Sequence, residues 1–387
     1  MNEAGIGSKR SLLIRGGMFL LPPPMEPFRG DLLIAEGRIA RLGRGLTAEE
    51  VLDARGLYVA PGFIDLQVNG GAGHDFMEAD AKAINEIIDF HVAHGTTGLL
   101  ATLISAPIAQ LREAMGQIRK AEHPALLGVH LEGPFISPAQ RGAHAPGHIL
   151  APSRERFDEL VRGYEDLVRI VTFAPELPGA DALLARIVEL RMIPALGHSN
   201  ATYEEACAAV AHGVRFFTHL FNGMRGFHHR EPGAVGAGLL TEVMVGLIAD
   251  KVHVHPAAMR LVYRLKGPER ICLVTDAIGA AGLPDGGYRL GRQRVSVQEG
   301  IARLADGSGV LAGSTLTMDR AVRNFLEATG CSLSEAVQAV SLNPARLLGL
   351  AECKGSLVEG KDADLVLFDA DFNVHYTIIG GEVVYAR

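Results

Sequence analysis

Short runs rich in β-branched and other apolar residues alternate with helical patterns along most of this chain. Eight such runs lie between residues 58 and 276, at 58–68, 97–104, 126–131, 168–174, 193–197, 214–219, 244–249 and 271–275. Capping residues and amphipathic spacing predict helices between them at 106–120, 154–163, 204–211 and 257–266, and a capping box at Ser332 and Glu335 opens another. Eight alternating strand and helix units predict a closed (β/α)8 barrel of the TIM type.

Both ends of the chain show the strict alternation of antiparallel strands. Residues 31–42 alternate around the turn Glu36-Gly37, and residues 363–385 alternate around Gly380-Gly381. Two β segments that bracket a barrel most simply pair with each other. We therefore expect a small β-sandwich domain from residues 1–57 and 355–387, around a barrel at 58–354. A hairpin-like stretch at 294–303 lies either near the barrel mouth or on the small domain.

The composition of the chain argues against some classes of binding partner. The chain has 387 residues, of which 48% are hydrophobic, and a formal net charge of −7. An acidic balance argues against a nucleic-acid surface and against an anionic membrane. The four cysteines show no CxxC spacing, and no apolar stretch approaches the roughly 18 residues of a membrane span. With no export signal recognisable, we expect a cytoplasmic protein.

Four of the expected strands end in residues that can carry chemistry. Glu132 follows the third strand, His198 the fifth, His219 the sixth and Asp276 the eighth. In a βα barrel all strand C-termini meet on one face, so these side chains should converge. One Glu and two His form a zinc ligand set that leaves a position open for water, and a nearby Asp can accept a proton from that water. The four endings predict a metal-dependent hydrolase.

Each of these residues also has a simpler interpretation. A histidine at a strand end is often structural, and Asp276 could cap a helix after the eighth strand. His130 is either a packed histidine or, as we prefer, a partner of the metal ligands. The turn-rich loop at 222–233 is either an anion pocket containing Arg230 or a solvated loop in which Arg230 pairs with Glu231. The residues alone leave that choice open.

An ordered series of motifs identifies a family resemblance. From about residue 12 to residue 385 the chain resembles the family of N-acetylglucosamine-6-phosphate deacetylases, within the amidohydrolase superfamily. The motifs are PGFIDLQVNG from Pro61, HGTT from His94, HLEGP from His130, GHS from Gly197, THLFN from Thr218, REPG from Arg230, TDA from Thr275 and LAGS from Leu311.

The resemblance implies a reaction and a set of roles. The expected reaction converts N-acetylglucosamine 6-phosphate to glucosamine 6-phosphate and acetate. Metal ligation is implied for Glu132, His198 and His219, and general acid/base catalysis for Asp276. Substrate contacts are implied for Ala143, His144, Asn222, Gly223, Arg230, His253, Leu311, Ala312 and Gly313. The family also implies a homodimer or homotetramer.

One position departs from the wider superfamily. Many amidohydrolases carry His-x-His after the first strand, whereas this chain has Gln67 and Asn69. Amides are poor zinc ligands beside imidazole. We therefore expect one divalent metal ion per chain, with Zn²⁺ the first choice and Fe²⁺, Mn²⁺ or Co²⁺ as alternatives.

Two rival functions can be weighed against this one. Another amidohydrolase, such as a cyclic-amide hydrolase or an adenine deaminase, is the first; a carbamylated lysine at the end of the fourth strand would favour a cyclic-amide hydrolase, and residues 171–176 contain no lysine. The second is a non-catalytic binding protein on the same scaffold. Such a protein could lose its ligands, whereas all four chemical residues are present here.

Overall fold

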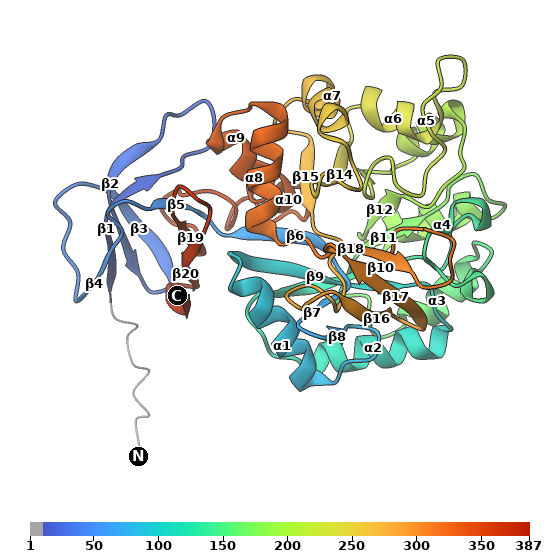
Figure 1. The fold of residues 1–387 in the computed structure, drawn as a ribbon, viewed down its shortest axis with the longest axis horizontal. Coiled ribbons are helices and arrows are strands. Elements are labelled where there is room, and N and C mark those ends of the chain that lie inside the picture. The colour runs from blue at the N-terminus through green and yellow to red at the C-terminus, as the bar shows by residue number, and fades with distance from the viewer. Residues whose placement is uncertain (1–10) are drawn as a thin grey trace.

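Eight parallel strands form the barrel of the molecule in the computed structural model, which describes residues 11–387 (Figure 1). They are β6 (Phe63–Val68), β9 (Thr96–Ile104), β10 (Leu126–Glu132), β11 (Val168–Phe173), β12 (Ile193–Leu196), β13 (Phe216–Phe217), β14 (Met244–Ile248) and β15 (Ile271–Val274). Each pairs with the next along the chain. The ends of β15 and β6 meet where the amide N–H of Asp276 donates to the carbonyl of Gln67 at 2.9 Å. The barrel predicted from the sequence is confirmed.

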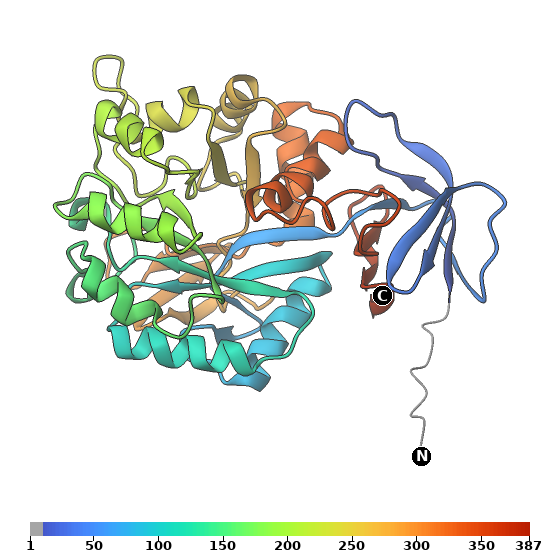
Figure 2. The same cartoon turned by 180° about the vertical axis from the view of Figure 1, so that it is seen from behind.

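Helices follow the strands and cover the outside of the barrel, as the two opposite views show (Figures 1 and 2). They are α1 (Ala81–Val92), α2 (Ile108–Lys120), α3 (Arg154–Val161), α4 (Ala180–Glu189), α5 (Tyr203–Ala211), α6 (Gly233–Leu240), α7 (Pro256–Lys266), α8 (Met318–Thr329), α9 (Leu333–Gln338) and α10 (Leu342–Leu347). The predicted capping box at Ser332 is present, and Thr202 forms a second one with Glu205. Such caps fix where a helix begins, which sets the length of the preceding loop.

One short hairpin, two 3₁₀ turns and one small sheet lie among the loops of the barrel. The strands β7 (Gly70–Gly71) and β8 (His74–Asp75) form a small hairpin, and the 3₁₀ turns Pro138–Gln140 and Pro146–His148 follow β10. After β15 comes an antiparallel sheet of β16 (Gly286–Leu290), β17 (Gln293–Gln298) and β18 (Ile301–Leu304). The predicted hairpin at 294–303 belongs to this sheet. Leu290 at the end of β16 helps to line a cavity at the barrel mouth. The hairpin therefore lies near the barrel mouth and not on the small domain.

The two ends of the chain form one continuous sheet. Its strands are β1 (Leu12–Phe19), β2 (Phe28–Ala35), β3 (Arg38–Gly43), β4 (Glu50–Asp53), β5 (Tyr58–Pro61), β19 (Leu365–Phe368), β20 (Val374–Ile379) and β21 (Glu382–Ala386). They surround a separate apolar core that includes Phe19, Leu32 and Leu365. The predicted pairing of the termini is confirmed, and the small domain is a single sheet. Residues 1–10, which the sequence analysis includes in this domain, lie outside the described residues.

The predicted strand 58–68 is two strands in different sheets. β5 pairs with β1 and β19 in the terminal sheet, and β6 pairs with β9 in the barrel. Gly62 separates them, and a Cβ there would lie 2.1 Å from Thr97 Oγ1, so the close approach requires glycine. Both strands are largely buried, so the apolar pattern runs on without a sign of the change.

Among residues 11–387, no helix combines the length and the apolar character needed to cross a lipid bilayer.

Candidate metal centre and active site

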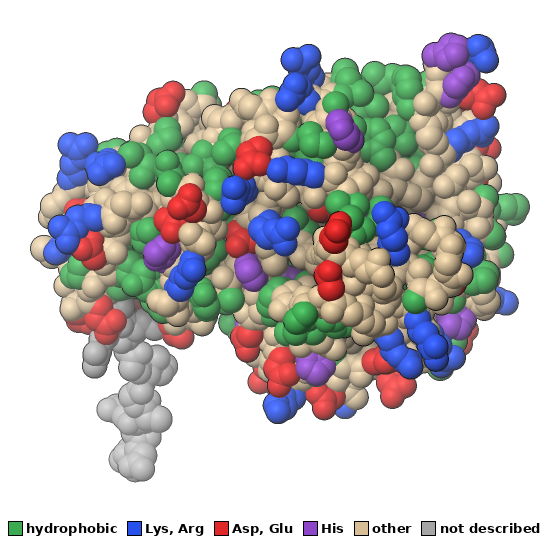
Figure 3. Space-filling model, viewed as in Figure 1, with side chains coloured by type: hydrophobic (Ala, Val, Ile, Leu, Met, Phe, Trp, Pro, Cys, Tyr) green, Lys and Arg blue, Asp and Glu red, His purple; other side chains and the backbone are tan. Residues whose placement is uncertain are grey.

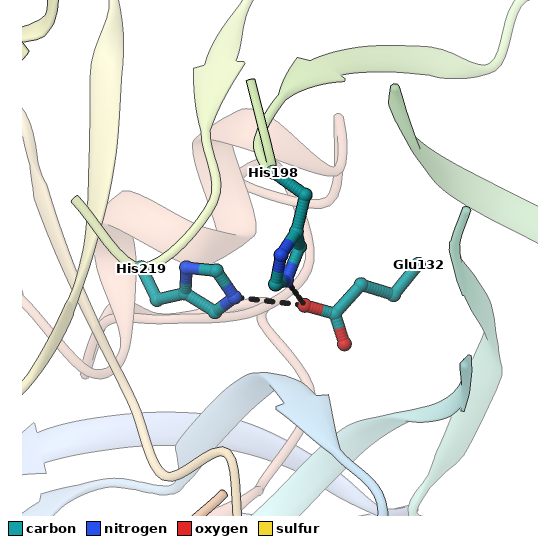
Figure 4. A group of neighbouring side chains, drawn as sticks. All are labelled: Glu132, His198 and His219. Atoms are coloured by element: carbon teal, nitrogen blue, oxygen red, sulfur yellow. Dashed lines mark hydrogen bonds and ion pairs between the residues drawn. The ribbon is translucent and has the colours of Figure 1, made fainter. Parts of the chain in front are cut away.

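The strand ends bring Glu132, His198 and His219 together inside the barrel mouth. Glu132 Oε1 lies 3.0 Å from His198 Nε2 and 2.8 Å from His219 Nε2 (Figure 4). All three side chains are buried, and their ligand atoms lie within 4.8 Å of one another. A carboxylate oxygen and two imidazole nitrogens are the donors that Zn²⁺ and similar ions bind. The residues therefore fit a single divalent ion.

The two histidines favour the ionised form of the Glu132 carboxylate. Burial tends to raise the pKa of Glu132, but hydrogen bonds from His198 and His219 outweigh it and hold that pKa well below its usual range. Burial alone would lower the pKa of His219, but its bond to Glu132 raises it. His198 Nδ1 donates to the carbonyl of Gln140 at 2.8 Å, which leaves Nε2 to act as a ligand.

The backbone at these positions has unusual geometry. His198, His219 and Asp276 have φ values of +47°, +28° and +51°. Left-handed backbone is rare for residues other than glycine, and it clusters at functional sites. Each of the three follows the end of a barrel strand, so the change of direction occurs where the side chain must enter the mouth of the barrel.

Asp276 is held beside the histidines and Glu132. Its Oδ1 accepts hydrogen bonds from Asn69 Nδ2 at 2.7 Å and from Gln67 Nε2 at 3.2 Å. Burial, followed by the nearby charge of Glu132, raises the pKa of Asp276 to about 6. A carboxylate with such a pKa can accept and return a proton near neutral pH.

A cavity of about 210 Å³ opens above these side chains. Eleven of the residues predicted for the site contribute to its lining, and Asn69 joins them: Glu132, Ala143, His144, His198, His219, Asn222, Gly223, His253, Asp276, Leu311 and Gly313. A larger open hollow of about 830 Å³, beside His74 and Arg289, contains none of the predicted site residues. Convergence of chemical groups identifies the site better than size does.

Two further histidines line the cavity with fixed orientations. The amide N–H of Ser105 donates to His144 Nδ1 at 3.2 Å, so Nδ1 is an acceptor and the proton of a neutral ring lies on Nε2. Burial and the neighbouring His198 lower the pKa of His144 to about 3, which keeps the ring neutral. His253 Nδ1 lies 2.6 Å from Asp250 Oδ2, which leaves Nε2 free to face the cavity.

Two predicted residues do not reach the cavity wall. Ala312 is buried between the two lining residues of its turn. Arg230 lies on the exposed loop before α6, where its Nη1 contacts His229 Nε2 at 2.8 Å. Figure 3 shows histidine and basic side chains gathered on a protrusion at the upper right, where Figure 1 shows this loop. The ion pair in this loop joins Arg225 to Glu231 at 2.9 Å, so the structure does not show the alternative in which Arg230 pairs with Glu231.

His130 is a packed histidine, and our preference for a partner of the metal ligands is wrong. Its ring nitrogens contact the carbonyl of Leu66 on β6 at 2.9 Å and Thr172 Oγ1 on the adjacent strand β11 at 2.7 Å. Burial lowers its pKa to about 4, so the ring is neutral. It ties the strands together beneath Glu132, with which it shares no described hydrogen bond.

Three residues that support the site were not predicted. Ser105 and Asp250 orient His144 and His253 as described above. Asp65, fully buried in β6, accepts hydrogen bonds from Thr275 Oγ1 at 2.6 Å and from the amide N–H of Gln67 at 3.1 Å. It links β6 to the residue before Asp276. A carboxylate within an apolar strand is costly without a partner, and that was the available signal.

Comparisons with known proteins agree with this geometry. Residues 58–384 match the model of the amidohydrolase family. The chain is 40% identical to N-acetylglucosamine-6-phosphate deacetylase of Bos taurus, over 96% of this chain and 98% of that protein. It is 39% identical to N-acetylgalactosamine-6-phosphate deacetylase of Escherichia coli O157:H7, over 91% and 94%. A solved mutant of the Mycobacterium smegmatis N-acetyl-D-glucosamine-6-phosphate deacetylase, in complex with N-acetyl-D-glucosamine-6-phosphate, superposes with a TM-score of 0.91 at 37% identity, over 97% of this chain and 100% of that one.

Proposed function

The chain belongs to the amidohydrolase family, and we propose that it hydrolyses the acetamide of N-acetylglucosamine 6-phosphate to glucosamine 6-phosphate and acetate. The observation that carries this proposal is the cavity in which a buried Glu-His-His group lies beside a carboxylate poised for proton transfer. Relatives that act on the glucosamine and galactosamine forms match this chain almost equally well. The assay below therefore includes both sugars.

We propose one divalent metal ion per chain, with Zn²⁺ the first candidate and Fe²⁺, Mn²⁺ or Co²⁺ as alternatives. Glu132, His198 and His219 would hold it, because their ligand atoms already converge. When bound, such an ion supplies Lewis acidity, which activates water and polarises a carbonyl group. The amides of Gln67 and Asn69 are the reason to expect no second tightly bound ion.

Asp276 moves the proton in this proposal. Its carboxylate accepts a proton from the attacking water as the new C–O bond forms at the acetamide carbonyl. The protonated Asp276 then donates that proton to the amine nitrogen as the C–N bond breaks. A pKa of about 6, raised by burial and by Glu132, suits both steps because neither form of the carboxyl is inaccessible near neutral pH.

The two cavity histidines would bind and polarise the substrate. His253, oriented by Asp250, turns Nε2 toward the cavity, where the carbonyl oxygen gains negative charge during attack. His144 offers an Nε2–H donor to a sugar oxygen. We further propose sugar contacts from Asn222 and Gly223 and from the turn at 311–313.

The phosphate group needs a positive partner. The cavity lining contains neither lysine nor arginine. We propose Arg230 for this role, since a guanidinium matches phosphate oxygens. Its exposed loop lies outside the lining of its own chain, so the loop must either move inward or come from another copy in the homodimer or homotetramer that we propose. We also propose that the protein acts in the cytoplasm, with no nucleic-acid or membrane partner.

One assay tests the proposal directly. The purified protein is incubated with N-acetylglucosamine 6-phosphate and with its galactosamine epimer, and release of acetate and of free amine is followed. We expect release from at least one sugar, its loss after chelation, and its return when Zn²⁺ is added back. No amine release at metal saturation, or turnover of a cyclic amide instead, would overturn the proposal.

A further inference from the structure

Asn69 lines the cavity and Gln67 lies buried beside it, and their amide groups face the two carboxylates of the site. We propose that these residues form an amide clamp, which holds Asp276 through Oδ1 and leaves Oδ2 as the atom that takes up and returns the proton. The inference rests on the proposed function, because it assigns the atom through which Asp276 acts. It makes Gln67 and Asn69 positioning residues of the reaction.

The contacts of the clamp are short and buried. Asn69 Nδ2 donates to Asp276 Oδ1 at 2.7 Å, and Gln67 Nε2 donates to the same oxygen at 3.2 Å. No described hydrogen bond reaches Oδ2, and Asp276 itself lines the cavity. Because Oδ1 already accepts two N–H groups, Oδ2 is the oxygen left to accept a proton.

The orientation of both amides follows from their neighbours. Turned the other way, each amide would set its carbonyl oxygen against a carboxylate oxygen, with no proton between them. In the observed orientation the buried Gln67 Oε1 and Asn69 Oδ1 have no hydrogen-bond partner among the described residues. An unpartnered buried oxygen is costly, so the donation to the carboxylates must outweigh that cost.

The two amide side chains differ in the number of carboxylates that they contact. Gln67 Nε2 also donates to Glu132 Oε1 at 3.0 Å, so Gln67 spans the proton acceptor and the proposed metal ligand. Asn69 contacts only Asp276 of these two carboxylates. Both side chains leave the same face of β6 and its end, because they are two residues apart. The backbone of Gln67 is tied in turn to Asp276 N at 2.9 Å.

The contacts predict different effects for the two residues. Asn69→Leu, which keeps the approximate size and removes the donor, should lower kcat by about 10- to 100-fold, with KM and metal affinity unchanged. Gln67→Met should lower kcat similarly and also weaken metal affinity by about 10- to 100-fold. Metal affinity is measured on chelator-stripped protein by competition with a coloured chelator, which requires no turnover.

A double-mutant cycle separates positioning from a merely structural role. If Asn69 acts through Asp276, then Asn69→Leu should cost less than about twofold in kcat when Asp276→Asn is already present. Asn69→Ala serves the same cycle should the leucine variant fail to fold. Asn85→Leu on α1 is the matched control, because it makes the same chemical change outside the cavity and should leave kcat unaltered.

The outcomes distinguish the clamp from the proposed function. An active parent in which Asn69→Leu changes kcat by less than twofold overturns the clamp alone. Equal losses in the two backgrounds also overturn it, since the amide would then be structural. Unchanged metal affinity in Gln67→Met removes the link to Glu132. A parent that releases no acetate from either sugar overturns the proposed function, and the clamp with it.

Discussion

Replacing Asp276 by Asn removes the proton acceptor while keeping its shape. Asp276 is 8% exposed, and its Oδ1 accepts N–H groups from Asn69 and Gln67. The carbonyl oxygen of an asparagine can take over those two hydrogen bonds. Its amide NH2 would then take the place of Oδ2. An amide nitrogen does not accept a proton at neutral pH, so binding should survive and proton transfer should fail.

The expected loss can be estimated from the role. General acid/base catalysis contributes about 10²- to 10⁴-fold, which corresponds to roughly 2.7–5.5 kcal/mol in the activation free energy. The same carboxyl both accepts the water proton and returns it to the amine, so we expect kcat to fall by about 10³-fold or more. KM should change by no more than about threefold, because Asp276 acts on the transition state.

The measurement is the rate of acetate release from N-acetylglucosamine 6-phosphate at metal saturation. Elemental analysis and a thermal melt show that the variant keeps its metal and its fold. Asp181→Asn, on the exposed start of α4, is a matched control that should retain full turnover. A kcat for Asp276→Asn within tenfold of the parent would remove Asp276 from the mechanism.

Three more predictions follow from the site. Arg230→Ala should cost roughly 2–4 kcal/mol in kcat/KM for the phosphorylated sugar and little for unphosphorylated N-acetylglucosamine; an equal loss on both would make Arg230 structural. Elemental analysis should find one metal ion per chain, and a need for two equivalents to saturate activity would contradict this. Because Asp276 must be ionised to accept a proton, and its pKa is raised to about 6 by burial and by Glu132, activity should fall as pH decreases. A bound cation would lower the pKa of Asp276 again. If activity already falls as the pH decreases from above 7, this would argue against Asp276 as the base.

Most of the barrel could be predicted because its strands and helices have different periods. The eight runs and the helix caps at Ser153, Thr202 and Ser332 depend on local sequence, and the structure has an element at each. The prediction of a single strand at 58–68 was wrong because two buried strands in different sheets share one apolar pattern. What separates them is the tertiary contact between Gly62 and Thr97, which no local pattern records.

The four chemically active residues of the site could be predicted because a parallel barrel brings the ends of all its strands to one face. Glu132, His198, His219 and Asp276 follow different strands, and parallel pairing brings those ends to one mouth. The surroundings could not be predicted in the same way. Whether His130 faces Glu132 or a neighbouring strand depends on side-chain packing, and the place of Arg230 depends on a long loop.

The backbone of the site shows most clearly where local reasoning stops. Local preference would put glycine or asparagine at left-handed positions, and a residue held there against preference costs of order 1–3 kcal/mol. Yet His198, His219 and Asp276 all adopt positive φ. Their carbonyls are held by hydrogen bonds from the backbone N–H groups of Ser137 at 2.8 Å, Asn222 at 3.0 Å and Ser314 at 2.8 Å, respectively. Glycine would relieve the strain but would offer neither a ligand nor a base. The three residues that break the local rule are thus those whose side chains the chemistry requires, and for His198 and Asp276 loops distant in sequence supply the bonds that hold them.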